Sequence, residues 1–297
     1  MATLARPGAH PRRIAYLGTP ELAVPTLVAI HEAGFEIPLV VTRPDRRRGR
    51  GGALSPSPVK AAALERGLQV TDDLEDLRGP EVDLAVVVAY GRIIPTSLLE
   101  MIPMVNLHFS LLPRWRGAAP VERALLAGDT RTGVCLMEVA EGLDTGAVFD
   151  VTEVEIAADD TLDSLRTRLV DLGTEMVLRA LIDGFAEPQP QIGEPVHAAK
   201  IDPSELELDW NASAERLSRV VRLGGAWTIF RGRRLKVWSA RVLSRSDLAA
   251  GALDGVVVGT ADGALELLEV QAEGRGRVPA TQWRNGAQPS AGDRLGP

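Results

Sequence analysis

The chain has 297 residues, a formal net charge of −7 and 45% hydrophobic content, which is enough for two ordinary domains with real cores. No run of about 18 apolar residues occurs, so we expect no membrane span. The acidic balance argues against a general nucleic-acid binder. Cys135 is the only cysteine, so no internal disulfide can form, which suits a reducing cytosol. One cysteine and four scattered histidines do not make a zinc site, and we expect no metal.

The first part of the chain alternates strand and helix patterns. Residues 1–12 contain arginines but no apolar stretch, so we expect a disordered tail rather than a signal peptide. Strands are expected at Arg13–Leu17, Ile37–Thr42, Asp83–Ala89 and Met104–Leu107, and helices at Pro25–Ala33 and Pro58–Arg66. The continuous apolar run in Asp83–Ala89 is typical of a parallel strand that is covered on both faces. The alternation predicts an open, mostly parallel α/β sheet.

The middle of the chain predicts a hairpin and a long helix. Thr132–Val139 and Ala147–Ile156 form the two arms, which are joined through Glu141–Gly146. Leucines at spacings of three and four then indicate a helix over Thr161–Phe185. We therefore expect one catalytic domain over residues 13–187. A proline-rich stretch with no helical period follows, and we interpret residues 188–208 as an interdomain linker.

Residues 209–297 have a different pattern. One helix is expected at Ala212–Arg222, with Asn211 or Ser213 as its N-cap. Short strands follow at intervals of about ten residues with glycine-rich turns, which is typical of a small β-barrel. These strands are expected at Ala226–Phe230, Arg234–Ala240, Gly255–Gly259 and Ala264–Gln271.

Several common catalytic motifs are missing. Gly18-Thr19-Pro20 follows the first strand but is not GxGxxG, and no GxxxxGK[ST] occurs, so a dinucleotide or P-loop site lacks its phosphate cradle. No serine lies in GxSxG, so nucleophilic hydrolase chemistry has no support.

Three polar residues remain as candidates. Asn106 and His108 are two positions apart at the end of a strand, so on an extended chain they point to the same side. Asp144 follows the first hairpin arm. Each alone is more often a cap, a structural histidine or a turn residue. Together they provide a hydrogen-bond donor, an acid/base and a carboxylate that could orient it, at the edge where open α/β sheets keep their sites.

Two long motifs, NLHFSLLPRWRGAAP (106–120) and GVCLMEVAEGLDTG (133–146), resemble those of the folate-dependent formyltransferases. The likeness covers nearly the whole chain, through RIAYLGTPELAVP, SPSPVKAAA, VVVAYGRIIP, HAAKIDPSELELDW, LKVW and QAEGRGRVPATQWRNG. Within this family the chain is most similar to the members that act on methionyl initiator tRNA. The resemblance implies a Rossmann-like, open and mostly parallel sheet of the formyltransferase type, followed by an OB-like barrel that binds tRNA.

The resemblance also implies a reaction, in which a formyl group passes from 10-formyltetrahydrofolate to the α-amine of methionyl initiator tRNA, for translation initiation. By analogy with the family, Asn106 and His108 would stabilise the tetrahedral oxyanion. Asp144 would hold His108 in its working tautomer and help to carry the proton of the amine. No metal and no covalent enzyme intermediate are needed.

Ligand contacts are implied in the same way. The segment Ser110, Leu111, Leu112, Pro113 matches the folate-contact segment of the family, and backbone groups of Val88, Ala89 and Tyr90 would line the pterin pocket. The basic segment of residues 43–50, RPDRRRGR, here called the arginine loop, matches the position of a loop that contacts the tRNA acceptor end, and the barrel would supply further cations. The expected tRNA contacts are Arg43, Arg46, Arg47, Arg48, Arg50, Arg231, Arg233, Arg234 and Lys236.

Three other functions remain open from the sequence. The acceptor could be a small amine such as a nucleotide sugar or glycinamide ribonucleotide, or water could replace the amine in a hydrolase. The chain could also be an RNA-binding protein on an inactive formyltransferase scaffold. Acceptor dependence separates these functions. We expect a cytoplasmic monomer with no membrane partner.

Overall fold

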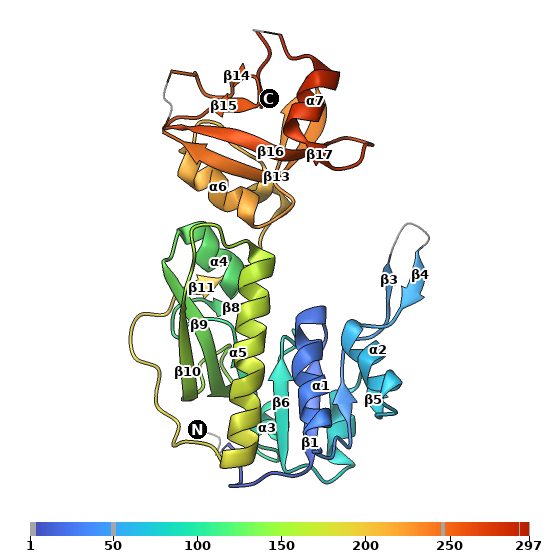
Figure 1. The fold of residues 1–297 in the computed structure, drawn as a ribbon. Helices are drawn as coiled ribbons and strands as arrows, with labels where there is room; N and C mark the ends of the chain where they lie inside the picture. Colours follow the sequence, from blue (N-terminus) through green and yellow to red (C-terminus); the bar gives the residue numbers. More distant parts are fainter. Residues whose placement is uncertain (1–3, 49–51, 245–246, 291, 297) are drawn as a thin grey trace. The chain divides into compact units, whose positions relative to one another are not determined.

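The structure, a computed structural model, describes residues 4–48, 52–244, 247–290 and 292–296 (Figure 1). Its contacts divide the chain into two compact units. The first contains the chain up to Val121 together with 131–155 and 166–199, and the second contains 122–130, 156–165 and the chain from Lys200 onwards. Two short segments of the expected catalytic domain therefore group with the C-terminal unit. None of the helices in the described ranges is long and apolar enough to cross a membrane.

A seven-stranded sheet forms the centre of the first unit, in the order β10-β9-β7-β6-β1-β2-β5. Five strands run parallel, and β9 and β10 join one edge in antiparallel pairing, so the predicted open, mostly parallel sheet is confirmed. The bounds are β1 Ile14–Gly18, β2 Val40–Val41, β5 Val70–Thr71, β6 Leu84–Val88, β7 Met104–His108, β9 Arg131–Glu138 and β10 Val148–Glu155.

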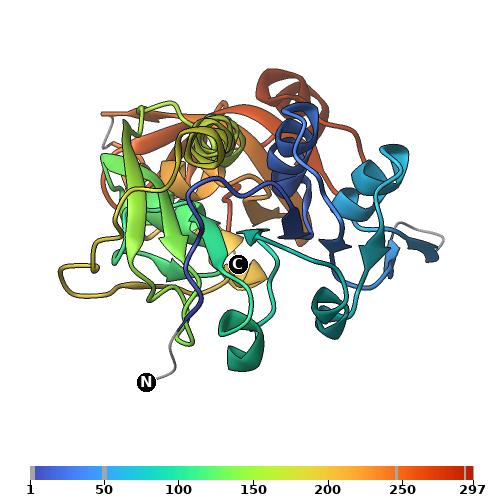
Figure 2. The same cartoon turned by 90° about the horizontal axis from the view of Figure 1, so that it is seen from below.

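Helices cover both faces of this sheet. α1 (Val24–Glu32) and α5 (Leu162–Asp183) lie side by side on one face, where the hydroxyls of Thr26 and Thr174 are 2.8 Å apart (Figure 2). α2 (Pro58–Glu65) begins at Ser57, whose hydroxyl accepts from the Lys60 N–H, and α4 spans Pro120–Ala127. The other face packs on the short elements η2 (Leu74–Arg78) and α3 (Thr96–Leu99), whereas η1 (Glu21–Ala23) leads directly into α1. Burial on both faces explains the continuous apolar sequence of β6.

A close contact between α5 and β7 shows to which face of the sheet the side chains of β7 point. A Cβ at Gly173 would lie 2.7 Å from Leu107 Cδ2, so only glycine lets the helix come this close to the strand. Leu107 therefore faces α5. Since successive side chains alternate along a strand, Asn106 and His108 point to the opposite face. The sequence prediction that these two residues share one side of the strand agrees with the observed strand bounds.

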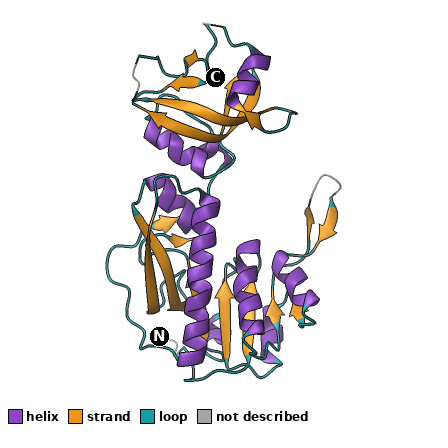
Figure 3. Ribbon diagram, in the orientation of Figure 1, coloured by secondary structure: helices purple, strands orange, loops and turns teal. Residues whose placement is uncertain are grey.

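The second unit contains an antiparallel sheet in the order β12-β13-β16-β15-β14, with β17 pairing to β16 (Figure 3). Isolated bridges Phe230↔Leu295 and Ala252↔Arg294 connect the two ends of this sheet through the C-terminal segment. The expected small β domain is thus confirmed, and Ser213 caps α6 as one of the two expected caps. The bounds are η3 Pro203–Leu206, α6 Ala214–Arg222, β12 Trp227–Phe230, β13 Arg233–Leu243, β14 Leu253–Asp254, β15 Val257–Gly259, β16 Ala264–Ala272, β17 Val278–Pro279 and α7 Ala280–Ala287.

Two small strand pairings were not predicted from the sequence. β11 (His197–Ala198), from the expected linker, pairs in parallel with β8 (Arg116–Gly117) in the first unit. The arginine loop contains a hairpin of β3 (Arg46–Arg48) and β4 (Ala53–Ser55). Both pairings involve very short polar segments, for which apolar periodicity carries no signal.

Candidate active site

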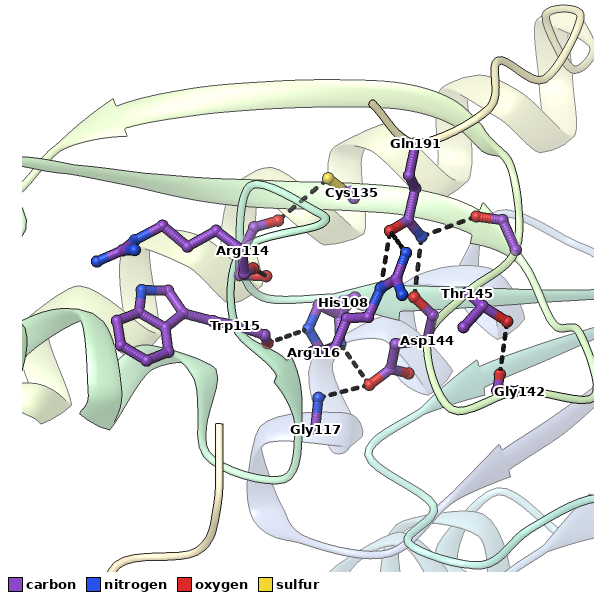
Figure 4. Close-up of polar contacts among 12 residues, drawn as sticks. His108, Arg114, Trp115, Arg116, Gly117, Cys135, Gly142, Asp144, Thr145 and Gln191 are labelled. Carbon is purple, nitrogen blue, oxygen red and sulfur yellow. Dashed lines mark hydrogen bonds and ion pairs between the residues drawn. The ribbon is translucent and has the colours of Figure 1, made fainter. Parts of the chain in front are cut away.

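His108 lies at the carboxyl end of β7 and is only 6% exposed. Its Nε2 atom is 2.9 Å from the carbonyl oxygen of Trp115 (Figure 4). Its Nδ1 atom is 3.7 Å from Oδ2 of Asp144. The structure therefore brings His108 and Asp144 together, although β9, which precedes Asp144, runs antiparallel to β7 and ends at the opposite edge of the sheet.

The tautomer of His108 follows from its partners. A carbonyl oxygen only accepts hydrogen bonds, so Nε2 must carry a proton and donate it to Trp115. The distance from Nδ1 to Asp144 exceeds that of a direct hydrogen bond. The Trp115 carbonyl is thus the direct hydrogen-bond partner of the ring, and Asp144 faces the other ring nitrogen, Nδ1. That Asp144 holds His108 in its working tautomer stays a prediction.

Asp144 occupies a strained turn between β9 and β10. Its φ of 52° lies in the left-handed region, which costs a non-glycine residue about 1 kcal/mol or more. Its Oδ2 atom accepts from the Gly117 N–H at 2.8 Å, and only 14% of the side chain is exposed. Thr145 Oγ1 donates to the Gly142 carbonyl at 3.0 Å in the same turn. The surrounding contacts hold the carboxylate beside His108.

Two further residues complete this network. Gln191 Nε2 donates to the carbonyl oxygens of Asp144 and Gly146, at 2.9 Å each. Arg116 donates to Gln191 Oε1 from Nε at 3.0 Å and from Nη2 at 2.6 Å (Figure 4). Sequence reasoning missed both residues. Gln191 lies in the proline-rich stretch whose composition predicts a linker, and no local pattern there indicates a long-range contact.

Asn106 lies on β7 beside Val87 of β6 and Met137 of β9. It is half-buried, and its carboxamide has no hydrogen-bond partner among the described residues. An amide that is placed next to His108 and not engaged by the protein can donate to a bound carbonyl or oxyanion.

The expected folate-contact segment has mostly structural partners. Ser110 is fully buried, and its hydroxyl donates to the Arg114 carbonyl at 2.7 Å. Its own carbonyl accepts from the Cys135 thiol at 3.1 Å. Burial raises the pKa of this thiol to about 11. Leu111 lies against Gly133 on β9, and the Leu112–Pro113 peptide is cis.

The other expected folate residues lie where the strand order of the sheet reverses, between β1 and β6. Val88 ends β6, Ala89 has a φ of 47°, and the Tyr90 carbonyl accepts from Thr19 Oγ1 at 3.2 Å. The Tyr90 side chain belongs to the core, so at Tyr90 only the backbone could face a ligand. Crevices at such reversals are where open α/β sheets bind ligands.

Some arginines of the arginine loop donate hydrogen bonds to backbone carbonyls, and some are exposed. Arg43 Nη1 donates to the Gly91 carbonyl at 3.0 Å, and Arg47 Nη1 donates to Gly52 at 3.2 Å. Arg46 is exposed. Arg50 and the side chain of Arg48 lie outside what the structure describes.

The expected cations of the C-terminal unit divide into two groups. Arg231 forms a bidentate ion pair with Asp293 and also donates to the carbonyls of Ala287 and Gln288, so its guanidinium is engaged in holding the fold. Arg233 is exposed and lies 3.8 Å from Glu273.

Arg234 and Lys236 instead line an open groove of about 300 Å³ together with Gln271, Ala272, Glu273 and Gly274. Arg234 stacks 4.1 Å from the Trp227 ring, and Lys236 lies 5.6 Å from that of Trp238. Cations beside aromatic rings are what nucleic-acid surfaces use to contact phosphates and stack bases.

Comparison with known proteins agrees with this geometry. The formyl transferase profile matches residues 12–181, and the profile of the formyl transferase C-terminal domain matches residues 200–288. The chain belongs to the formyl transferase family. A methionyl-tRNA formyltransferase of Burkholderia pseudomallei strain 668 is 42% identical, over 97% of this chain and 98% of the relative.

Solved structures share the fold. An N-formyltransferase from Helicobacter canadensis, crystallised with folinic acid and dTDP-3-aminofucose, superposes with a TM-score of 0.66 at 15% identity, over 86% of this chain and 98% of that one. HypX from Aquifex aeolicus in complex with tetrahydrofolic acid gives a TM-score of 0.63 at 19% identity, over 93% of this chain. The chain spans about half of HypX, 47% of its length. Both of these structures hold a folate, folinic acid in the first and tetrahydrofolic acid in the second.

Proposed function

We propose that this chain transfers a formyl group from 10-formyltetrahydrofolate to the α-amine of methionyl initiator tRNA, the activity for which its Burkholderia relative is named. The observation that carries the proposal is the 42% identity to that relative across both units of the chain. The proposed site supports the same chemistry, because it combines an unengaged amide, an imidazole and a carboxylate at the carboxyl edge of the sheet.

The reaction needs a neutral amine and a stabilised oxyanion. Free α-amino groups have a pKa of about 8, so part of the amine is neutral and able to attack at physiological pH. The amine nitrogen attacks the formyl carbon, and a tetrahedral intermediate with a negative oxygen forms. The amine loses one proton, N10 of the folate gains one, and the bond between the formyl carbon and N10 breaks. Tetrahydrofolate and formylmethionyl-tRNA are the products.

The positions of the three residues support a role for each of them. The Asn106 carboxamide donates to the oxyanion, an interaction that is typically worth about 3–4 kcal/mol. His108 keeps one proton on Nε2 for Trp115 and receives the amine proton on Nδ1, directly or through water. The imidazolium that forms faces the Asp144 carboxylate at 3.7 Å and lies near the developing negative charge. No step needs a metal ion.

The two ligands would occupy separate surfaces of the chain. The folate would lie at the reversal between β1 and β6, against the backbone of residues 88–90 and the Ser110–Pro113 segment. The tRNA would contact the exposed Arg46 and Arg47 of the arginine loop and the groove at Arg234 and Lys236. We place the protein in the cytoplasm, where initiator tRNA is formylated, and expect it to act as a monomer.

An acceptor panel tests the proposal. Purified protein and 10-formyltetrahydrofolate are mixed with methionyl initiator tRNA, free methionine, dTDP-3-aminofucose or no acceptor, and tetrahydrofolate release is followed. Release only with the charged tRNA, and its loss in His108→Ala, is the expected result. Release with the amino sugar alone would assign a small-amine acceptor, and release without any acceptor would assign a hydrolase.

A further inference from the structure

The carboxamide of Gln191 connects the strained Asp144 turn to Arg116. Its two N–H groups donate to the carbonyls of Asp144 and Gly146, and its oxygen accepts twice from the Arg116 guanidinium. These partners fix the orientation of the amide, because a flipped amide would set N–H groups against the guanidinium and an oxygen against two carbonyls. Gln191 therefore uses its full hydrogen-bonding capacity to hold this turn.

The same network also contacts the side chain of Asp144. The carboxylate accepts from the N–H of Gly117, the residue directly after Arg116. Arg116 and Gly117 form the short strand β8, which the expected linker holds in place. Arg116 N donates to the Val196 carbonyl at 2.8 Å, and His197 pairs with Arg116. Backbone and carboxylate of Asp144 are thus fixed to one structure, formed by residues 116–117 and the segment around Gln191.

The geometry points to Gln191 as a positioning residue for the formyl transfer. Gln191 would act through Asp144, keeping the strained turn in the conformation that sets the carboxylate 3.7 Å from His108. This inference rests on the proposed function and adds to it a residue outside both family motifs of the sequence. A displacement of about 1 Å in a catalytic constellation can cost about 100-fold in rate, so a residue that fixes the turn has a measurable kinetic effect.

The substitution Gln191→Glu separates the two halves of the contact. A glutamate keeps a favourable partner for the Arg116 guanidinium but loses both donors and sets a carboxylate against the carbonyls of Asp144 and Gly146. Gln189→Glu is the matched control. It lies two positions earlier in the same segment and is exposed, and among the described residues its side chain donates to the Glu187 carbonyl alone, at 3.1 Å.

Two readouts decide the inference. Gln191→Glu should lower kcat for formylation of methionyl initiator tRNA by about 10- to 100-fold with KM for both substrates within about threefold, while Gln189→Glu stays near wild type. In an Asp144→Ala background, Gln191→Glu should cost nothing further. Independently of activity, amide hydrogen exchange at Gly117, which donates to Asp144, should speed up about tenfold in Gln191→Glu alone.

The outcomes are distinguishable. Wild-type protein that transfers no formyl group to the tRNA would refute the proposed function, and Gly117 exchange would still test the positioning. Unchanged kcat and unchanged exchange in Gln191→Glu would overturn the inference. A loss of the same size in the Asp144→Ala background would overturn it too, because it would mean that Gln191 does not act through Asp144. A large fall in Tm in Gln191→Glu would assign a purely structural role.

Discussion

Replacing Gly146 by alanine should damage both stability and activity. A Cβ at this position would lie 2.0 Å from the Glu138 carbonyl oxygen and 2.8 Å from its carbonyl carbon. Both are backbone atoms of a paired strand, so no side-chain rotation relieves the clash and the two arms must separate by about 1 Å or more. Overpacking of this kind costs about 1–3 kcal/mol, less the roughly 0.4–1 kcal/mol gained by restricting the unfolded chain.

The expected result is a fall in Tm of a few degrees, since about 1 kcal/mol shifts a domain of 150–250 residues by roughly 2–4 °C. Because the Gly146 carbonyl also accepts from Gln191 and follows the Asp144 turn, kcat should fall by about 10- to 100-fold. Gly286→Ala is the matched control, because a Cβ there meets no atom within 4 Å. Thermal melting and steady-state kinetics compare the two variants. Equal Tm and kcat in both would refute the reasoning.

Further predictions concern the site, the tRNA surface and the buried thiol. Asn106→Ala should lower kcat by about 10²–10³-fold, and an effect on KM alone would contradict its role as an oxyanion donor. Arg234→Gln and Lys236→Gln should each reduce by about one the slope of log affinity for methionyl-tRNA against log salt, and unchanged slopes would remove them from the interface. Burial raises the pKa of Cys135 to about 11, so the native thiol should resist iodoacetamide at about pH 8 and react on unfolding. The folded thiol keeps a proton that the unfolded thiol releases above its ordinary pKa of 9.0. The free energy of unfolding should therefore fall as the pH rises from 9 to 11. Cys135→Ala should remove the part of this fall that comes from the thiol.

Most of the fold could be predicted because its signals are local. The apolar run of Leu84–Val88 and the periodic leucines of α5 reflect burial, and the structure places them as expected. His108 and Asp144 were expected together from their two motifs, but strand direction alone does not explain the pair, because β9 runs antiparallel to β7 and ends at the edge of the sheet opposite to His108.

The partners of these residues were not predictable in the same way. The Trp115 carbonyl that binds His108 is backbone, and its position depends on a turn in which Trp115 has a φ of 64°. Gln191 contacts the Asp144 turn across 47 residues of sequence, from a segment whose composition indicates only a linker. The sequence predicts Arg231 as a tRNA-binding surface cation, but in the folded chain it forms an ion pair with Asp293. Long-range contacts of this kind leave no periodic pattern in the sequence.

The most direct test of the account is to identify the product on the tRNA itself. Methionyl initiator tRNA is incubated with the protein and 10-formyltetrahydrofolate and digested with nuclease, and the aminoacyl-adenosine is analysed by mass spectrometry. The account predicts N-formylmethionyl-adenosine with the wild-type protein and unmodified methionyl-adenosine with His108→Ala. Consumption of the folate while the methionyl end stays unformylated would contradict it.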